Sequence, residues 1–445
     1  MNTALNLFNI CEEPPIALEE VFEAYFQCRK NKRRTCNAIG FETDFEDKLI
    51  RLWEDIVDGT YYPGRSIAFV VTKPVKREVF AADFRDRIVH HLIAAKIMDL
   101  LEAEFINDSY SCRVGKGTQY GIKRVAEFIR NCSQDYTQDC YILKMDIKSF
   151  FMSMDKPLLY KQLIAFLEEK YQGRDKNLLF ELIRKVIFNA PEDNCCVKGV
   201  RSDWKGLPPS KSLFTVPKNK GLPIGNLTSQ LFANFYLNGF DHFVKNDCHM
   251  EFYGRYVDDF VIVHQDKQVL LDLIPKLREF LKQKLMLTLH PNKIYLQHFS
   301  KGVKFVGAVI KPGREYIANR TKGNFFEAIR NFNQAADEDD NYIRENAEHF
   351  VSSINSYLGF MKHYSTYKIR RKMIVENISD KWKKVITFDD RMNKISLCRE
   401  VKPDYVQKLK LRRQRINRRR NRKKQMPAAK VSVRQAVVKN LNPFV

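Results

Sequence analysis

Two adjacent aspartates, Asp258 and Asp259, stand between runs of β-branched and aromatic residues in the stretch GRYVDDFVIVHQD (residues 254–266). The alternation of apolar residues on both sides predicts a β-hairpin that carries the pair at or near its tip. A third acid, Asp146, ends the apolar run YILKM, which also predicts a strand. Carboxylates at the ends of two neighbouring strands could hold the same ligand.

Paired carboxylates of this kind suit a site for divalent metal ions. Two cations about 4 Å apart stabilise both the attacking and the leaving oxygen of a phosphoryl transfer. Mg²⁺ prefers oxygen ligands and completes its coordination with water and substrate phosphate. A solvated Asp-Asp turn is the alternative interpretation, but the bulky Tyr256 and Val257 before the pair argue against it. So does the Gly/Pro loop at 221–225, which lies between the acids in the sequence.

The charge of the chain narrows the class of partner. The 445 residues include 76 Lys and Arg against 53 Asp and Glu, a net charge of +23. Residues 401–445 hold 15 basic residues and one acidic residue. This balance favours a polyanionic partner, most commonly nucleic acid, although a basic tail is also compatible with a solvated arm.

Composition and length indicate a globular protein of two or three domains, with 44% hydrophobic residues. No run approaches 18 apolar residues, and the N-terminus lacks the pattern of a signal peptide, so we expect no membrane association. The ten cysteines are scattered and form no CxxC pair, so we expect free thiols in the cytoplasm and no zinc site.

Periodicity predicts the elements that must position these acids. Strands are expected within YILKMDIKSFF (141–151) and VKFVGAVIKPG (303–313), and a strand-turn-strand unit within AFVVTKPVKREVFAADF (68–84). A helix of about five turns is expected over 83–105, with Asp83 or Asp86 near its start. Other helices are expected over 18–33, 44–59, 158–171 and 177–190, from about Thr228, and again after about residue 315.

These blocks, taken in order, resemble those of reverse transcriptases. YVDD at 256–259 resembles the YxDD box, and YILKMDIKSFF resembles the block that carries the first catalytic aspartate. The other matching blocks are KREVFAADFRDRIVHHLI (76–93), FINDSYSCRVGKGTQYGI (105–122), LPIGNLTSQ (222–230), LHPNKIYLQ (289–297) and VKFVGAVI (303–310). The resemblance spans about 235 residues.

The resemblance implies an α+β, right-hand polymerase with fingers, a palm with an antiparallel sheet, and a helical thumb. The expected domains are an N-terminal extension and helical fingers with a strand insert (1–140), a palm with helical segments at 157–190 (141–315), a thumb (316–400) and a basic tail (401–445). The tail need not be ordered without nucleic acid.

The resemblance also implies roles at the site. Asp146 and Asp258 are expected to bind two Mg²⁺ ions, with the main-chain carbonyl of Ile147 as a further ligand, and Asp259 to complete the catalytic set. Lys293 matches a lysine that protonates the leaving pyrophosphate, a general-acid role. The substrates would be deoxynucleoside triphosphates, which a primer strand receives opposite a template RNA.

A second set of residues is expected to bind the nucleotide. Phe151 stands where the family places an aromatic ring that excludes a ribose 2′-OH, although composition alone would suit Phe150 equally. The triphosphate is expected to meet Lys73 and Arg77, with Arg85, Arg87 and Arg113 as alternatives. The remaining expected contacts to the nucleotide are Ile147, Ile224, Gly225 and Gln230. The expected nucleic-acid contacts are Arg113, Lys116, Arg412, Arg413, Arg418, Arg419 and Arg420.

The loop IGNLTSQ indicates a subfamily. Many reverse transcriptases read QGxxxSP here, whereas this chain has Ile224 for Gln and Gln230 for Pro. The variant is similar to the enzymes of diversity-generating retroelements, which misincorporate opposite template adenines during mutagenic retrohoming and work with a small basic accessory protein. The resemblance implies a bacterial or phage-encoded protein in which Ile224 affects fidelity. The alternative is that Ile224 only packs beneath its loop.

Three other functions stay open at this point. Two are a maturase-like group II intron enzyme and a defence-associated reverse transcriptase. The loop variant, and the roughly 45 residues after the expected thumb, count against the intron type. The third is a catalytically idle RNA-binding scaffold, which the three retained acids argue against.

Overall fold

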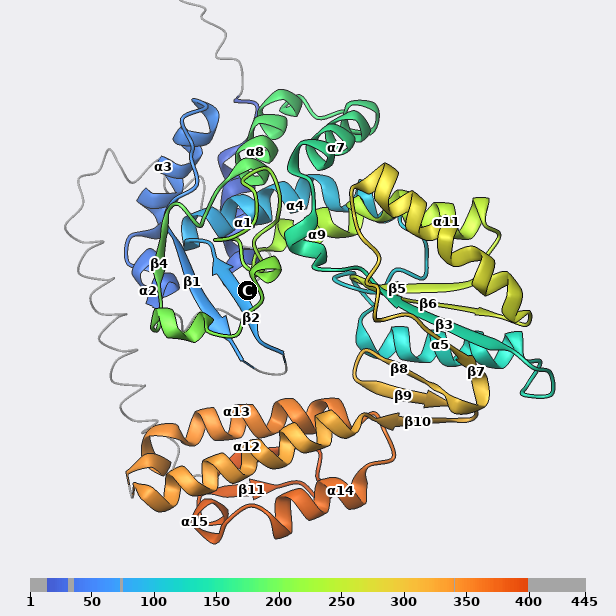
Figure 1. Cartoon of the computed structure of the whole chain (residues 1–445). Helices are drawn as coiled ribbons and strands as arrows, with labels where there is room; N and C mark the ends of the chain where they lie inside the picture. Colours follow the sequence, from blue (N-terminus) through green and yellow to red (C-terminus); the bar gives the residue numbers. More distant parts are fainter. Residues whose placement is uncertain (1–13, 31–35, 73–74, 340, 399–445) are drawn as a thin grey trace, which may run out of the picture. The chain divides into compact units, whose positions relative to one another are not determined.

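The computed structural model describes residues 14–30, 36–72, 75–339 and 341–398 (Figure 1). The chain divides into two compact units, Met1–Ala318 and Asn319–Val445. Lys73 and the tail arginines named above lie outside the described residues. No described helix is both long and apolar enough to cross a membrane.

Helices form the N-terminal part of the first unit, and α4 lies at their centre, against α1 and α9. The helix α4 begins after Asp83, whose carboxylate accepts a hydrogen bond from the amide of Arg85 (3.0 Å), so the predicted helix and cap are confirmed. The helices are α1 (Leu18–Arg29), α2 (Cys36–Glu42), α3 (Phe45–Val57), α4 (Phe84–Glu104), α7 (Lys156–Lys170), α8 (Lys176–Phe188), α9 (Leu227–Tyr236) and α10 (Asn238–His242).

A three-stranded sheet of order β2-β1-β4 lies beside these helices (Figure 1). The predicted strand-turn-strand unit is confirmed as the antiparallel pair β1 (Ser66–Val71) and β2 (Arg77–Ala81), and β4 (Cys195–Val197) pairs parallel to β1. The carboxylate of Glu78 is buried and accepts from Trp204 Nε1, Ser212 Oγ and Leu213 N, each at 2.6 Å. Because side chains alternate along a strand, Arg77 has the opposite orientation and is exposed.

The second sheet of this unit has four antiparallel strands in the order β5-β6-β3-β7. Its helix α5 (Thr118–Cys132) and helix α11 (Lys267–Leu285) cover opposite faces (Figure 1). The strands are β3 (Tyr141–Asp146), β5 (Phe252–Tyr256), β6 (Asp259–His264) and β7 (Tyr295–His298). The predicted hairpin around Asp258 is confirmed as β5-β6, and so is the predicted α+β class with an antiparallel sheet.

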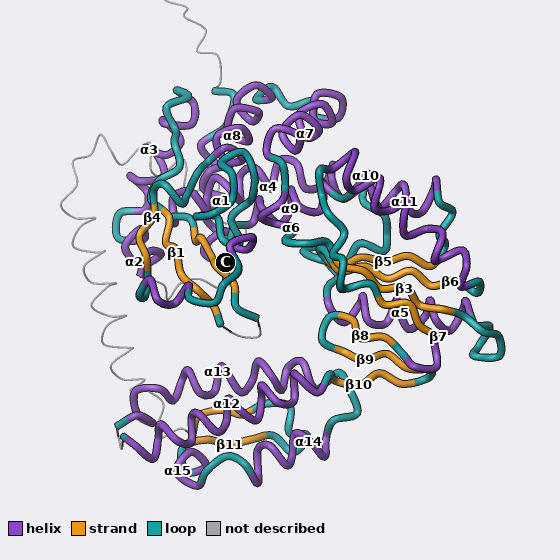
Figure 2. The backbone as a smooth tube through the Cα atoms, viewed as in Figure 1, coloured by secondary structure: helices purple, strands orange, loops and turns teal. Residues whose placement is uncertain are grey.

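The stretch 303–313 was expected to hold one strand, and that prediction is wrong. It forms two strands, β8 (Val303–Phe305) and β9 (Ala308–Lys311), which pair antiparallel and continue into β10 (Arg314–Ile317) (Figure 2). The chain reverses at Val306 and Gly307, whose φ angles are 38° and 92°. A glycine inside an apolar run marks the turn, because glycine adopts positive φ at little cost.

The second unit contains α12 (Asn319–Glu338), α13 (Tyr342–Met361), α14 (Tyr367–Arg371) and α15 (Asp380–Lys383). Its core forms around Trp382, which is fully buried and stacks on Phe350 with ring centroids 4.0 Å apart. The segment also holds a hairpin, β11 (Ile386–Phe388) and β12 (Ile395–Leu397), which helical periodicity did not predict. Asn355 fixes this hairpin by hydrogen bonds to both the amide and the carbonyl of Ile395, each at 2.8 Å.

Candidate active site

The register of the four-stranded sheet brings the three predicted carboxylates to one end of it. Asp146, the last residue of β3, lies opposite Asp259, the first residue of β6. Tyr256 pairs with Asp259, so that Val257 and Asp258 form a two-residue turn between β5 and β6. We call residues 256–259 the carboxylate turn. The amide of Ile147 donates to the carbonyl of Asp258 (3.1 Å), which ties this turn to the end of β3.

Two non-glycine residues beside the carboxylates have left-handed backbones. Val257 has a φ of 58° in the carboxylate turn, and Ser149 has a φ of 50° just before α6 (Phe150–Ser153). A β-branched residue in this region is a genuine outlier. Such strain costs about 1–3 kcal/mol per residue and persists only where the surroundings over-determine the backbone.

Each carboxylate at this end of the sheet has a distinct electrostatic environment. Lys293 Nζ lies 2.9 Å from Asp146 Oδ2, and Lys144 Nζ lies 2.9 Å from Asp259 Oδ1. Burial, with the neighbouring charge of Asp146, raises the pKa of Asp258 to about 6. Burial also raises the pKa of Asp259 to about 6, against the opposing effect of Lys144. A cation placed between Asp146 and Asp258 would relieve their repulsion, whereas Asp259 already has a cationic partner.

The donor set fits Mg²⁺ bound jointly by protein and substrate. Within the described ranges, no group of three or more His, Cys, Asp or Glu side chains is placed to hold a metal ion. Asp146 and Asp258 supply carboxylate oxygens, and Mg²⁺ commonly takes one or two carboxylates and fills its other positions with water and phosphate. The side chain of Ile147 is fully buried, so only its main chain is available to a ligand.

The residues expected to bind the nucleotide divide into exposed and internal ones. Arg77 is exposed and close enough to Asp258 that its charge lowers the pKa of that carboxyl. Phe150 is only 2% exposed and belongs to the main apolar core. Phe151 is half-buried and also contacts a second apolar cluster, built on Ala68, Phe80, Met152 and Leu213. Phe151 is therefore the ring that could meet a substrate.

The segment 222–226, which we call the LPIGN loop, is tied to β2. The carbonyl of Ile224 accepts from Phe80 N (3.0 Å), and the half-buried Ile224 side chain packs on the same cluster as Phe151. Gly225 has a φ of 123°, and a Cβ there would lie 2.9 Å from Val79 Cγ1. Gln230 is exposed at the side of α9, where its Oε1 accepts from Cys112 Sγ (3.1 Å).

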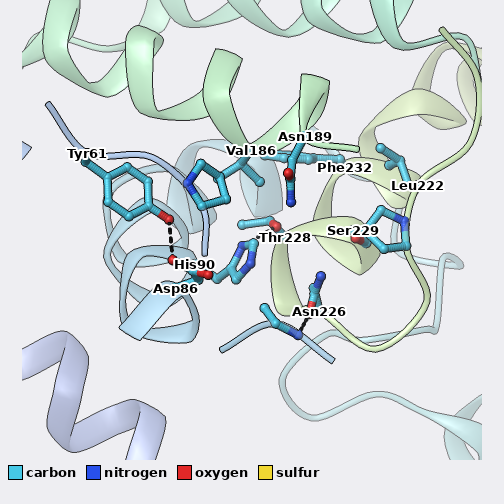
Figure 3. Close-up of a pocket in the computed structure, with 13 residues that line it drawn as sticks. Tyr61, Asp86, His90, Val186, Asn189, Leu222, Asn226, Thr228, Ser229 and Phe232 are labelled. Carbon is cyan, nitrogen blue, oxygen red and sulfur yellow. Dashed lines mark hydrogen bonds between the residues drawn. The ribbon is translucent and has the colours of Figure 1, made fainter. Parts of the chain in front are cut away.

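A small cavity of mixed polar and apolar lining lies against the LPIGN loop, and it was not predicted as a site (Figure 3). Asp86 accepts from Tyr61 Oη (3.0 Å) and from the amide of Gly64 (2.8 Å), and burial raises its pKa to about 6. His90 Nδ1 and Thr228 Oγ1 are 2.7 Å apart. In the sequence, Asp86 and His90 lie one helical turn apart on α4, a spacing that indicates a shared face but not this cavity.

Most of the other predicted cations have internal partners. The guanidinium of Arg113 is 5% exposed and donates to Glu102 Oε2 (2.7 Å) and to the carbonyls of Ile106 and Ser109. Lys116 donates to Asn107 Oδ1 (3.2 Å). Arg87 donates to the carbonyl of Ala82 (2.8 Å), and Arg85 pairs with Asp55. These contacts give Arg113 a structural role, and among the described cations expected to meet the triphosphate Arg77 is the exposed one.

Sequence reasoning missed one buried ion pair next to the carboxylate turn. Arg255 and Asp241 are both 0% exposed, and Arg255 also donates to the carbonyl of Val257 (3.0 Å). The only sequence signal is a charged residue inside an otherwise apolar strand. Asp241 lies in the preceding helix, and nothing in its local pattern indicates the pairing.

A comparison with known protein families identifies the family of this chain. Residues 76–310, more than half of the chain, match the family described as reverse transcriptase (RNA-dependent DNA polymerase). The chain belongs to the reverse transcriptase family. This match begins just before Arg77 and includes Asp146, Asp258 and Lys293. It covers the whole four-stranded sheet and strand β2, and it begins after β1.

Individual relatives of this reverse transcriptase are distant. Protein YkfC of Escherichia coli K12 is 21% identical over 58% of this chain and 69% of the relative. An uncharacterized 91 kDa protein in the cob intron of Schizosaccharomyces pombe is 24% identical over 46% of this chain and 22% of the relative. Among solved structures, apo telomerase from Candida tropicalis has a TM-score of 0.45 and 14% identity, with 70% of this chain and 56% of the telomerase covered.

Proposed function

We propose that this reverse transcriptase family member is an active RNA-directed DNA polymerase that works by two-metal-ion nucleotidyl transfer. The observation that carries the proposal is the placement of Asp146 opposite Asp259, with Asp258 in the two-residue turn between β5 and β6. The sequence separates Asp146 from the other two by more than 100 residues, yet all three meet at one sheet end. The substrates would be deoxynucleoside triphosphates, a primer strand and a template RNA.

In this proposal Asp146 and Asp258 hold two Mg²⁺ ions, with the carbonyl of Ile147 as a further ligand. The bound ions would supply charge stabilisation to the attacking and leaving oxygens. Arg77 neutralises the triphosphate, since it is exposed and lies near Asp258. Lys293, held 2.9 Å from Asp146, donates a proton to the leaving pyrophosphate.

Substrate choice is assigned to two apolar side chains that share one cluster. Phe151 would exclude a ribose 2′-OH and so select deoxynucleotides. Ile224 packs on the same cluster as Phe151, so the shape of the LPIGN loop and the shape of the sugar site are linked. Gly225 and Gln230 complete this side of the nucleotide site.

We further propose that the enzyme belongs to a diversity-generating retroelement, with misincorporation opposite template adenines. The support is the IGNLTSQ variant, in which Ile224 replaces a glutamine amide by an apolar surface. A lost hydrogen bond of this kind removes about 1 kcal/mol of discrimination, or several-fold. A small basic accessory protein and a bacterial or phage-encoded, cytoplasmic setting belong to the same proposal, as does RNA binding by Lys116 and the basic tail.

The experiment is primer extension on an RNA template with all four deoxynucleotides, followed by sequencing of the products. Wild type is compared with Asp258→Asn and with Asp272→Asn, a control on the exposed face of α11. Extension by wild type and the control alone, abolished by EDTA, supports the polymerase. Errors concentrated opposite adenine support the retroelement assignment, and accurate products contradict it. No extension even with cognate RNA and an accessory protein would favour a non-catalytic RNA-binding scaffold.

A further inference from the structure

The turn that carries Asp258 contains an unfavourable backbone conformation, and one buried arginine contacts the residue that adopts it. Val257 has a φ of 58°, at the position where a tight hairpin usually has glycine. The Nη1 of Arg255 donates to the carbonyl of Val257 at 3.0 Å. A strained residue needs surroundings that hold it, and this hydrogen bond comes from the strand that leads into the turn.

The guanidinium of Arg255 is fixed in direction by its ion pair with Asp241. Arg255 Nε lies 2.7 Å from Asp241 Oδ1, and Nη2 lies 2.5 Å from Oδ2. The hydroxyl of Tyr253 donates to the same Oδ1 at 2.5 Å. A bidentate pair sets the plane of the guanidinium, so the third nitrogen is aimed at Val257 and cannot rotate away. Both charged side chains are completely buried, which excludes solvent competition for these contacts.

Arg255 also joins the carboxylate turn to residues 108–110, which precede the sequence RVGKGT (113–118). The Arg255 amide donates to Asp108 O, and its carbonyl accepts from Tyr110 N, each at 2.9 Å. Its Nη2 also reaches Ser109 Oγ (3.3 Å). The segment lies so close to the strand that a Cβ on Gly254 would be 2.1 Å from Tyr110 Oη. Movement of either segment would therefore be transmitted to the other through Arg255.

We infer that Arg255 is a positioning residue for the carboxylate turn, holding the Val257 carbonyl and thereby the orientation of Asp258. Arg255 does not itself reach substrate. The inference concerns the geometry of the turn, and only its kinetic consequence rests on the proposed polymerase function. A purely structural ion pair would contribute to stability without affecting the turn.

A built-in reporter separates these two roles. The amide of Ile147 donates to the carbonyl of Asp258 at 3.1 Å, so its hydrogen exchange reports the position of the turn. This readout requires no metal, nucleotide or nucleic acid. It can be measured on the full chain, whether or not polymerisation is detected.

The main variant is Arg255→Lys, which keeps a charge near Asp241 but cannot hold Asp241 and Val257 at once. The control is Lys96→Met, which removes a different cation, with a side chain that is 10% exposed, from its ion pairs with Asp175 (Nζ–Oδ2 2.8 Å) and Glu20. Arg255→Lys is expected to speed Ile147 exchange about tenfold, the effect of losing one charge-assisted hydrogen bond. It is expected to lower kcat about 100-fold, as small misplacements of reacting groups do, with little change in KM for the nucleotide. Lys96→Met is expected to lower Tm but to change neither readout.

The exchange rate at Ile147, together with kcat, decides the inference. Wild-type exchange at Ile147 in folded Arg255→Lys would overturn it, and so would faster exchange with an unchanged kcat. If Arg255→Lys fails to fold, Tyr253→Phe replaces it, because this variant removes only one hydrogen bond to Asp241. Several-fold faster exchange at Ile147 in Tyr253→Phe would then support the inference. Exchange at the wild-type rate would overturn it. If wild type does not polymerise, the exchange result still decides the role in the turn, while the proposed function fails separately.

Discussion

The carboxylate turn and the LPIGN loop both contribute residues to the proposed nucleotide site, and they are held in different ways. Charged side chains hold the turn: Arg255 contacts Val257, and Lys144 contacts Asp259. A main-chain hydrogen bond to β2 and an apolar cluster hold the loop. The turn keeps a strained valine where glycine would be relaxed, whereas the loop uses glycine at its own positive-φ position.

This difference shows which properties the carboxylate turn and the LPIGN loop each need. A turn that carries two carboxylates near a third must resist their repulsion, so buried cations and a stiff residue suit it. A loop that shapes a substrate pocket needs close approach to a strand, which Gly225 permits because it lacks a Cβ. We therefore expect the turn to respond most to changes in charge and stiffness, and the loop most to changes in volume.

The largest expected effect comes from the carboxylates at this end of the four-stranded sheet. Asp146→Asn removes one proposed metal ligand and the partner of Lys293, and a bound metal supplies several kcal/mol of stabilisation to the transition state. We expect the single-turnover rate of nucleotide incorporation to fall by at least about 100-fold. The control is Asp139→Asn, just before β3, where the side chain is 79% exposed. Equal rates in both variants would contradict the assignment of Asp146.

The second-largest effect is expected from a change in side-chain volume in the LPIGN loop. Gly225→Ala places a Cβ 2.9 Å from Val79 in a backbone conformation that L side chains rarely adopt. We expect a loss of about 1–3 kcal/mol of unfolding free energy, measured by denaturant titration. Gly323→Ala in α12, where the added Cβ meets nothing within 4 Å, is expected to be neutral or slightly stabilising. Similar stability changes in the two variants would contradict the account of the loop.

Relaxing the strained valine is expected to leave stability nearly unchanged and to lower activity. In Val257→Gly, relief of strain is offset by the extra flexibility of glycine in the unfolded chain, so the net stability change should lie within about 1 kcal/mol. Because the turn becomes less rigid, we expect kcat to fall several-fold. A calorimetric Tm with a parallel rate measurement checks both. A variant as active as wild type would mean that stiffness of the turn is unimportant.

The raised pKa values predict a pH effect on stability that is visible without metal. Folded Asp258 and Asp259 have pKa values of about 6, above the ordinary carboxyl range, so the folded state binds more protons than the unfolded state. Stability in EDTA should therefore fall as the pH rises from about 4 to about 6 and stay lower above that range. In Asp258→Asn this decline should be shallower, as seen in Tm across the same pH series. Added Mg²⁺ should restore stability mainly above pH 6.

The smallest expected effect is on fidelity. Ile224→Gln restores an amide that can contact the nucleotide, and we expect misincorporation opposite template adenine to fall several-fold, in line with about 1 kcal/mol. Ile224→Val, which keeps an apolar surface, serves as the control. Sequencing of the extension products measures the error spectrum. An unchanged spectrum in Ile224→Gln would remove Ile224 from the explanation of fidelity.

Local patterns predicted the elements that carry the site. The hairpin around Asp258 and the start of α4 depend on residues close in sequence, and both were predicted correctly; of the two acids expected near that start, Asp83 is the cap. The turn inside 303–313 was missed, because an apolar run hides it except at Gly307. The register that places Asp146 opposite Asp259 spans more than 100 residues, so local pattern could suggest that the acids share a ligand but could not give the pairing.

Side-chain partners were the least predictable part of the site. Arg113 belongs to a motif that resembles a nucleic-acid contact, yet Glu102 and two carbonyls occupy its guanidinium. The pairing of Arg255 with Asp241 depends on a helix and a strand that meet only in the folded chain. Such pairings follow from tertiary packing, which a sequence pattern does not specify.

The most direct test of the catalytic assignment is the single-turnover incorporation of one deoxynucleotide opposite an RNA template, with enzyme in excess over primer-template. We predict incorporation by wild type in Mg²⁺, and at least about a 100-fold slower rate for Asp258→Asn, with binding of the primer-template unchanged. Equal rates for wild type and Asp258→Asn would contradict the claim that the carboxylate turn is the catalytic centre.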